Sequence, residues 1–497
     1  MGSGWRLIGG LGAGAWKTSN AINRGLSGRV EAAVANRGLG AARSGVLGPG
    51  DADPPPHAPD FFDYRGAATL RSLSHLRGLP FTLGSVIDPR RGPAGQIGLD
   101  ERFLARHAAV IGPSGSGKTS SIIIPWIAAA LQQGNSVVAV DVAGDLLEQV
   151  LDYRKVVGAL GATVGMWDYT KPSTSVSWNW LADLNSEESV VSAVEALIGR
   201  ENPNDPQPFF AQRDRRVLRG LIDAVCEISS NPSIDTLLLA ARDQPTLKRL
   251  VALAPKAKAR LSEVEQMNAV DFGRAMSGIN NALDVFEHPN VRHVTARIQF
   301  TARSLFDRPS LIVIGAPLHG SRTSVTLSSL MISQITRELY TRFGTTQGQQ
   351  VFLFLDEAAR LTDRINFEEL LSVSRRAGVS VVLAAQTVTQ FRDENERSAI
   401  LDNCGTYISL PTPSKESAEY FISRLGQRQQ SSMSVNRQIG STFSSSSTQY
   451  SRSVASVPVI GPREIMDPPW GGRPAVIHCV EAASAPILVD LSRDDLG

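Results

Sequence analysis

The sequence predicts an α/β fold, in which helices cover both faces of a parallel sheet and an all-α region is inserted. Three observations predict it. Short uninterrupted runs of Val, Ile and Leu recur along the chain, as expected of strands buried on both faces. A glycine-rich loop joins one of these runs to a helical segment. Between residues 183 and 302 long helical patterns replace the strand-like runs.

The bulk composition is that of a soluble globular protein. The 497 residues are too many for one compact domain, and 42% of them are hydrophobic and 20% charged. A net charge of +2 excludes a histone-like electrostatic binder but allows a local basic channel. The three cysteines lie far apart, which argues against a disulfide framework or a zinc site. No stretch offers the ~20 largely apolar residues of a membrane span.

The N-terminal segment, residues 1–60, is basic, rich in Gly and Ala, and closed by a proline-rich linker. Within residues 1–50, six Lys and Arg side chains face the single acid Glu31, a balance of +5. The segment lacks the continuous apolar core of a signal peptide. Two interpretations stay open: a flexible tail, or a basic amphipathic segment that touches a membrane or a partner.

The predicted elements follow in order along the chain. The strand candidates are Ala108–Ile111, Ser136–Val142, Ala162–Trp167, Ser310–Ile314, Val351–Leu355, Val379–Ala385, Thr406–Leu410, Ala475–Val480 and Pro486–Leu491. The helix candidates of the inserted region include Glu188–Ile198, Phe209–Ile228 and Thr236–Ala254. The Ser- and Gln-rich stretch Gln427–Ser456 is expected to be an exposed, disordered loop.

The glycine-rich loop has the pattern G-x-x-x-x-G-K-[ST], which is the phosphate-binding P-loop. Its glycines let successive backbone N–H groups point at a phosphate chain, and the following helix adds its dipole. Lys118 is expected to reach the β- and γ-phosphates, and Thr119 to place its hydroxyl on Mg²⁺. The predicted ATP contacts are Gly112, Pro113, Ser114, Gly115, Ser116, Gly117, Lys118 and Thr119.

A second motif completes an ATPase site. The apolar run Val351–Leu355 ends in two acids, Asp356 and Glu357. A buried strand fixes such carboxylates at the carboxyl edge of the sheet, where ligands bind in open α/β sheets. Asp356 is expected to hold the Mg²⁺ shell, and Glu357 to polarise the attacking water as general base.

Three further residues are candidates for the same site. Gln386 ends the run Val379–Ala385 and is expected to act as a polar sensor beside the γ-phosphate. Arg375 is a candidate arginine finger that reaches the ATP of a neighbouring subunit. Asp141 either supports the magnesium shell or caps the next helix.

These motifs define six parts of the chain, with a RecA-like P-loop core interrupted by the helical insertion. The parts are residues 1–60, the basic segment and linker; 76–182, the first part of the nucleotide-binding domain; 183–302, the all-α domain; 303–428, the second part, with the acidic strand and the sensor; 429–457, the disordered Ser-rich loop; and 458–497, strands that complete the core.

The combination of motifs resembles the type IV secretion coupling proteins, the TraG/TraD-like conjugation ATPases. The segment His107–Pro125 is similar to that family's P-loop and its proline-bearing helix. Leu355–Gln390 resembles its signature region, associated with recognition of a relaxosome accessory protein, and Val457–Asp467 resembles its closing segment. Two positions depart from the pattern: Ala143 stands where the family has lysine, and Trp180 where proline is usual.

The resemblance implies a hexameric ring ATPase, with ATP and Mg²⁺ as cofactors, that moves single-stranded DNA and its attached relaxase toward a secretion channel. It implies partners among relaxosome proteins and channel components, and a cytoplasmic location at the inner face of the membrane. Such proteins usually carry N-terminal transmembrane helices, and no such helix is evident in the sequence. Membrane contact is therefore expected to be indirect or to run through residues 1–50.

Three alternatives stay open at this point: a motor that delivers protein effectors, a HerA/FtsK-like duplex translocase, and a ring that gates a channel without pumping. The helical insertion and the absence of a C-terminal winged-helix pattern argue against FtsK. Four arginines at one helix start, near Phe209 and Phe210, suggest a cargo contact but more often form a solvated helix face.

Overall fold

The structure, a computed structural model, describes residues 73–88, 92–153, 161–200, 208–317, 321–341, 350–391, 393–439, 446–468, 470, 472–483 and 485–492. The basic segment 1–60 lies outside the described residues. The chain forms one large unit, Pro59–Arg428 with Val457–Gly497, and a second unit that includes Gln429–Ser456.

The centre of the large unit is a parallel sheet. Its order is β9 (Thr406–Ser409), β3 (Ala108–Ile111), β8 (Val379–Ala385), β7 (Val351–Leu355), β4 (Ser136–Asp141), β6 (Ser310–Gly315) and β5 (Thr163–Trp167). Neighbouring strands in this series run parallel. The predicted α/β fold with a P-loop core is confirmed, and each strand lies within one residue of its predicted ends.

An antiparallel extension continues the sheet beyond β9. It consists of β12 (Pro474–Cys479), β13 (Ile487–Asp490), β1 (Phe81–Asp88) and β2 (Gly92–Leu99). The sequence pattern does not reveal β1 and β2, because glycines interrupt their alternation. Gly84 lies at φ +95° beside a register shift, and a Cβ there would lie 2.3 Å from the backbone oxygen of Asp490.

Helices cover both faces of the sheet, which explains the continuous apolar strands. On one face, buried residues of α3 (Glu101–Leu104), α4 (Ile124–Gln132) and α5 (Leu146–Asp152) pack with Val110 and Val137. On the other face, α6 (Glu187–Ile198), α13 (Ser321–Tyr340), α14 (Phe367–Ser374), α15 (Glu394–Asn403), α16 (Lys415–Leu425) and α17 (Pro462–Met466) pack with Ile111 and Val138. Successive strand residues therefore enter opposite cores.

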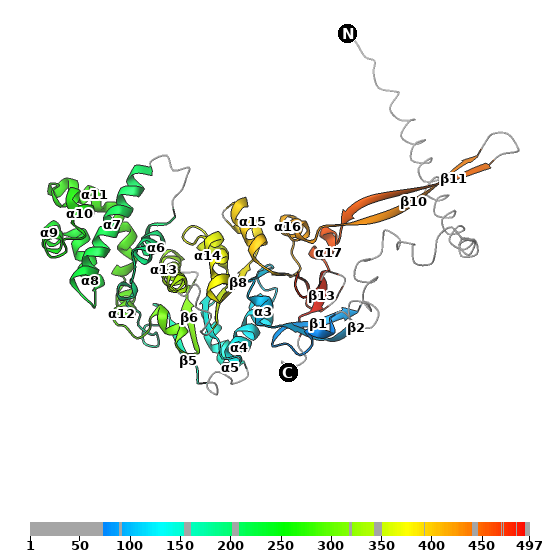
Figure 1. Cartoon of the computed structure of the whole chain (residues 1–497), viewed down its shortest axis with the longest axis horizontal. Coiled ribbons are helices and arrows are strands. Elements are labelled where there is room, and N and C mark those ends of the chain that lie inside the picture. Colours follow the sequence, from blue (N-terminus) through cyan, green and yellow to red (C-terminus); the bar gives the residue numbers. More distant parts are fainter. Residues whose placement is uncertain are drawn as a thin grey trace, which may run out of the picture. The chain divides into compact units, whose positions relative to one another are not determined.

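The all-α insertion follows β5 and precedes β6, and its helices gather in one cluster beyond that end of the sheet (Figure 1). It contains α7 (Pro208–Ile228), α8 (Ile234–Arg242), α9 (Gln244–Leu253), α10 (Lys258–Glu265), α11 (Ala269–Leu283) and α12 (Pro289–Thr295). The single helix predicted over Thr236–Ala254 is wrong, because the chain breaks at Asp243. The Asp243 carboxylate accepts from the Thr246 N–H at 2.9 Å and so starts a new helix that has Pro245 in its first turn.

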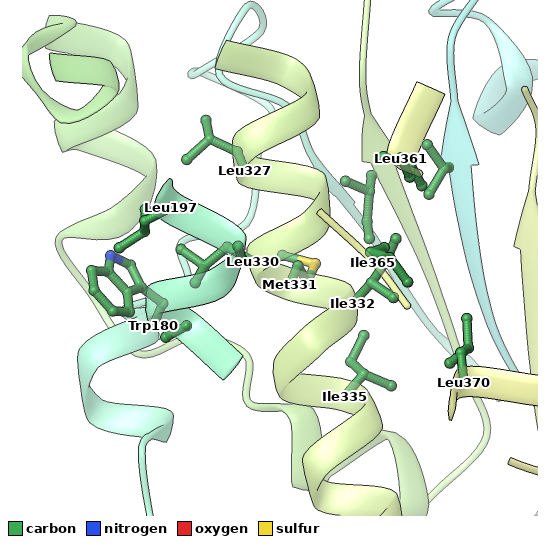
Figure 2. Packing of buried hydrophobic residues seen from close by; sticks show 14 of the residues in the cluster. Trp180, Leu197, Leu327, Leu330, Met331, Ile332, Ile335, Leu361, Ile365 and Leu370 are labelled. Carbon is green, nitrogen blue, oxygen red and sulfur yellow. The ribbon is translucent and has the colours of Figure 1, made fainter. Parts of the chain in front are cut away.

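Helix α13 packs between α6 and the segment that follows β7. Figure 2 shows its residues Leu327, Leu330, Met331, Ile332 and Ile335 with other apolar side chains on either side. Trp180 and Leu197 lie on one side, and Leu361, Ile365 and Leu370 lie on the other. Leu361 ends the 3-10 turn η8 (Ala358–Leu361), which directly follows Asp356, the predicted metal ligand, and Glu357, the predicted general base. Helix α13 thus supports the segment that carries them.

The Ser-rich stretch forms strands, in contrast to the disordered loop that its composition predicts. The strands β10 (Gln427–Ile439) and β11 (Ser446–Pro458) form a two-stranded sheet of their own. Thr, Tyr and Val recur among the serines and favour extended backbone over disorder.

None of the described helices is both long and apolar enough to cross a bilayer.

Candidate functional site

The P-loop connects β3 to a helical segment whose first turn is wide, η2 (Thr119–Ile123), and which continues as α4. Gly115 and Gly117 adopt φ of +75° and +93°, a conformation that favours glycine because it has no Cβ. The Gly112 N–H donates to the Ala385 oxygen of β8 at 3.1 Å. The loop is therefore anchored at the carboxyl edge of the sheet, where a phosphate chain would meet its amides.

Lys118 lies folded back onto its own loop. Its ammonium donates to the backbone oxygens of Gly112 at 2.7 Å and Pro113 at 3.1 Å, and the residue is only 7% exposed. Burial lowers the pKa of this amine, and the nearby charges of Asp356 and Glu357 oppose that shift. The Lys118 ammonium is held only by neutral carbonyls in a buried site, so it can exchange them for a phosphate.

Thr119 and Asp356 converge across the sheet edge. The Thr119 hydroxyl donates to the Asp356 carboxylate at 3.1 Å. Burial raises the pKa of Asp356, while the hydrogen bond from Thr119 and the charge of Lys118 lower it. A hydroxyl and a carboxylate beside a P-loop are the hard oxygen donors that suit Mg²⁺, so these two residues fit the predicted metal position.

Glu357 is held in an unusual backbone conformation. Its φ of +58° and ψ of +47° are left-handed, which costs a non-glycine residue ~1–2 kcal/mol. Two amides hold its carboxylate: Gln386 donates to one oxygen at 3.2 Å and Gln390 to the other at 3.3 Å. Gln390 in turn accepts from the Gln386 N–H at 3.1 Å. Together, the strained backbone and the two amides fix the orientation of the Glu357 carboxylate.

An open cleft of about 670 Å³ brings most of the predicted site residues together, although Gly112, Pro113, Ser116, Asp141 and Arg375 do not line it. Its lining includes Ser114, Gly115, Gly117, Lys118, Thr119, Asp356, Glu357 and Gln386. The strand order explains the arrangement, because β8, with Gln386 at its end, lies between the P-loop strand β3 and the acidic strand β7. Sensor, acid and phosphate loop therefore meet at one edge, although some 240 residues separate them in sequence.

Asp141 caps a loop. One of its carboxylate oxygens accepts from the Gly144 N–H at 2.8 Å and the other from the Leu146 N–H at 3.0 Å. Burial raises its pKa, and these backbone hydrogen bonds oppose the shift. Both carboxylate oxygens of Asp141 are thus occupied by N–H groups at the start of α5. Of the two roles that the sequence left open, magnesium support and helix capping, this favours capping. Ala143, in the same loop, lines the cleft.

Arg375 lies at the opposite edge of the sheet from the P-loop. It begins the turn η9 (Arg375–Ala377), which precedes β8, and its side chain is exposed. Since β8 has seven residues, roughly 20 Å of strand separate Arg375 from Gln386. Arg375 therefore does not reach the nucleotide cleft of its own chain.

His107 has a structural role at that same edge. Its Nδ1 accepts from the Val381 N–H at 3.1 Å, which leaves Nε2 to donate to the Leu371 oxygen at 2.7 Å. Burial, together with the charge of Arg375, lowers the pKa of His107 to about 4. The neutral ring joins the strands that carry the P-loop and the sensor.

The arginines at the start of α7 are engaged inside the insertion. Arg213 pairs with Asp214 at 2.8 Å, and Arg216 and Arg219 pair with Glu263 and Glu187. Arg215 donates to the Gly199 oxygen at 2.8 Å. These contacts agree with a structural helix face and do not support a cargo contact.

Gln390 and Arg360 also line the cleft, and sequence patterns assigned neither of them a role there. Gln390 lies four residues after Gln386, within the turn η10 (Val388–Gln390), and its spacing could have identified it. Arg360 lies on η8, three residues after Glu357, and donates to the Ala316 oxygen at 3.0 Å. Only the fold places Ala316, at the end of β6, within its reach.

Residues 83–469, more than half of the chain, match the family described as type IV secretory system conjugative DNA transfer. The chain belongs to this family. The resemblance inferred from the motifs is thereby confirmed.

One relative is the probable conjugal transfer protein TraG of Sinorhizobium fredii (strain NBRC 101917 / NGR234). It is 24% identical over 394 residues, which cover 74% of this chain and 59% of the relative. The chain thus spans about three fifths of the length of that member of the family.

Solved structures of the plasmid coupling protein TrwB have a similar fold. The unbound form of TrwBΔN70 aligns with a TM-score of 0.58 at 17% identity, covering 80% of this chain and 87% of TrwB. The complex of TrwB with ADP and Mg²⁺ aligns with a TM-score of 0.59 at 18% identity, covering 81% and 88% of the two chains. At these identities the likeness concerns the fold.

Proposed function

We propose that this chain is a ring-forming ATPase that couples ATP hydrolysis to the transfer of DNA, with its attached relaxase, into a type IV secretion channel. The observation that carries the proposal is the convergence of Lys118, Asp356, Glu357 and Gln386 on one cleft beside the P-loop. Membership of the conjugative DNA transfer family and the ADP–Mg²⁺ and ADPNP complexes of TrwB support it.

The proposed nucleotide site divides its work between loop and strand. The P-loop amides cradle the phosphates, and Lys118 transfers its ammonium from the Gly112 and Pro113 carbonyls to the β- and γ-phosphates. Thr119 and Asp356 would hold Mg²⁺, which would neutralise charge on the phosphate oxygens.

Glu357 is the proposed general base. Gln386 and Gln390 hold its carboxylate in the cleft, so that the carboxylate accepts the proton of the attacking water. Because Gln386 lies at the end of the strand next to the P-loop strand, we propose that it also senses the γ-phosphate. A change at the phosphate would then reach Glu357 through one side chain.

The proposed cargo and partners follow from the family. We infer single-stranded DNA, a relaxase with its relaxosome proteins, and secretion channel components as partners, and a homo-hexamer as the working assembly. The family match favours DNA cargo over protein effectors and over a HerA/FtsK-like role. We place the protein in the cytoplasm at the inner face of the membrane, held there indirectly or through residues 1–50.

Two substitutions test the nucleotide site. Lys118→Ala should abolish ATP binding and hydrolysis, because the phosphates lose their cation. Glu357→Gln should keep ATP binding but lower turnover by roughly 10²–10⁴-fold, the usual contribution of a general base. Both are measured by steady-state phosphate release and by binding of a fluorescent ATP analogue.

The matched control is Glu368→Gln, at an exposed acid in the first turn of α14. Near-normal turnover in Lys118→Ala or Glu357→Gln would refute the assignment of the site. Assays with single-stranded DNA, duplex DNA or none then test the cargo. Failure of DNA to bind or to stimulate hydrolysis would remove the DNA part of the proposal and leave the ATPase part standing.

A further inference from the structure

A second cleft, of about 410 Å³, lies next to the nucleotide cleft and is lined by three arginines. Arg322, Arg360 and Arg364 line it together with Ile198, Gly199, Val325 and one acid, Asp363. The arginines come from two separate segments, the first turn of α13 and the region that follows Glu357. The fold therefore gathers three guanidinium groups against one carboxylate.

These cations lack the acidic partners that other arginines of the chain have. Among the described residues, none of the three forms an ion pair, whereas Arg213, Arg216 and Arg219 on α7 each pair with an acid. The charge of Glu357 acts on Arg360 and that of Asp363 on Arg364, but Arg322 and Arg364 repel one another. A bound anion would therefore relieve a cost that the protein now bears.

Backbone carbonyls hold each guanidinium in place without neutralising it. Arg364 Nη1 donates to the Leu197 oxygen at 2.9 Å and to the Ala196 oxygen, at the C-terminal end of α6. Arg322 Nη2 donates to the Asn281 oxygen of α11 at 2.9 Å. A guanidinium has five N–H donors, so each of these groups keeps donors for a ligand while its position is fixed.

Arg360 adds the most specific observation. Its Nη1 donates to the Ala316 oxygen at 3.0 Å, but its Nη2 is buried and has no hydrogen-bond partner among the described residues. A buried donor without an acceptor costs about 1–3 kcal/mol. Arg360 lines both the nucleotide cleft and this second cleft, so a ligand of one is adjacent to a ligand of the other.

We propose that Arg322, Arg360 and Arg364 form a phosphate-binding site that is coupled to the nucleotide cleft through Arg360. Arginine forks match phosphate oxygens in geometry and charge, and the cleft is open enough to admit a phosphate group. The phosphate belongs either to the backbone of a nucleic acid strand or to free inorganic phosphate leaving the nucleotide cleft. The inference deepens the proposed function, since it rests on this chain handling nucleotides and a DNA strand.

The test uses the full chain with a non-hydrolysable ATP analogue filling the nucleotide cleft. The variant is Arg322→Gln, because Arg322 is exposed and its loss leaves the core intact. The matched control is Arg274→Gln, an arginine with a 79% exposed side chain on α11. One arm measures binding of a labelled 20-nucleotide oligo-dT across salt concentrations. The other measures the rise in unfolding temperature on adding inorganic phosphate.

If a strand backbone is the source, Arg322→Gln weakens oligonucleotide binding about tenfold at low salt. It also makes the slope of log K against log salt shallower by about 0.7, the value of one released contact on a single strand. If free phosphate is the source, oligonucleotide binding is unchanged and the phosphate-dependent rise in unfolding temperature is lost. Arg274→Gln should behave like wild type in both arms.

Identical behaviour of Arg322→Gln and Arg274→Gln in both arms would overturn the site, while the proposed motor function would stand if wild type binds the oligonucleotide. A wild type that binds no oligonucleotide would remove the DNA part of the proposed function instead. The phosphate arm would then decide the site alone. Circular dichroism of both variants guards against a folding defect.

Discussion

At the scale of single residues, contacts within the protein hold the polar groups of the site in position. The Lys118 ammonium donates to loop carbonyls, which it must leave in order to bind a phosphate. Glu357 has a left-handed backbone, which a non-glycine residue adopts only under constraint. The side-chain amides of Gln386 and Gln390 hold the Glu357 carboxylate. Each arrangement costs a little folding energy and places a charge where phosphate chemistry needs one.

His107 gives a pH-dependent prediction at this scale. Its pKa is about 4 when folded and ordinarily 6.5, so between these values the unfolded chain binds a proton that the folded chain does not. Stability should therefore fall as the pH drops below 6.5. The loss from this residue should reach about 2 kcal/mol by pH 5.

The measurement is urea denaturation of wild type and His107→Asn at pH 7 and pH 5. Asn tolerates the left-handed backbone of this position, φ +58°, and does not titrate. Burial also lowers the pKa of His478 to about 4, but that residue is present in both proteins and its effect cancels. An equal loss of stability in the two proteins would show that His107 does not titrate as described.

At the scale of elements, helix α13 packs between the insertion side and the catalytic side. It lies between Trp180 and Leu197 on one side, toward which Leu330 points, and Leu361, Ile365 and Leu370 on the other (Figure 2). Arg322 at its first turn also bonds to α11 of the insertion. One helix thus touches the all-α domain, the cleft lined by the three arginines and the core.

Leu330→Ala should lower the free energy of unfolding by about 2–5 kcal/mol, because it leaves a cavity at a fully buried position. Leu239→Ala, on α8 and 57% exposed, is the matched control and should cost under about 0.5 kcal/mol. Chemical denaturation midpoints measure both. A cost below about 1 kcal/mol for Leu330→Ala would mean that α13 is not tightly packed there.

At the scale of the whole molecule, Arg375 can act as an arginine finger only if the site is completed between subunits. Its exposed side chain lies roughly 20 Å of strand from its own nucleotide cleft, too far to act there. An arginine finger from this position would have to serve a neighbouring copy. The proposed ring supplies such a neighbour.

Arg375→Ala should reduce turnover by roughly 10³–10⁵-fold in the assembled ring and leave that of dilute subunits unchanged. Arg376→Ala, the adjacent exposed arginine, is the control. ATPase rates are measured against protein concentration, with light scattering to report assembly. Unchanged turnover of Arg375→Ala in the assembled state would exclude it as the finger.

Sequence reasoning succeeded where local chemistry suffices. Buried parallel strands are recognisable because both faces must be apolar, so β7 and β8 were predicted to the residue. It failed where glycine breaks the alternation, as in β1 and β2, and where a cap divides a helix, as at Asp243. Composition alone also failed to predict β10 and β11.

The sequence by itself determined the P-loop, the acids after β7 and the family, because each depends on residue type at fixed spacing along the chain. Only the tertiary structure decided which distant residues join them. Strand order sets Gln386 between the P-loop and the acids. It also gathers Arg322, Arg360 and Arg364 at one cleft. Such proximity depends on how strands and helices pack, and no local pattern encodes it.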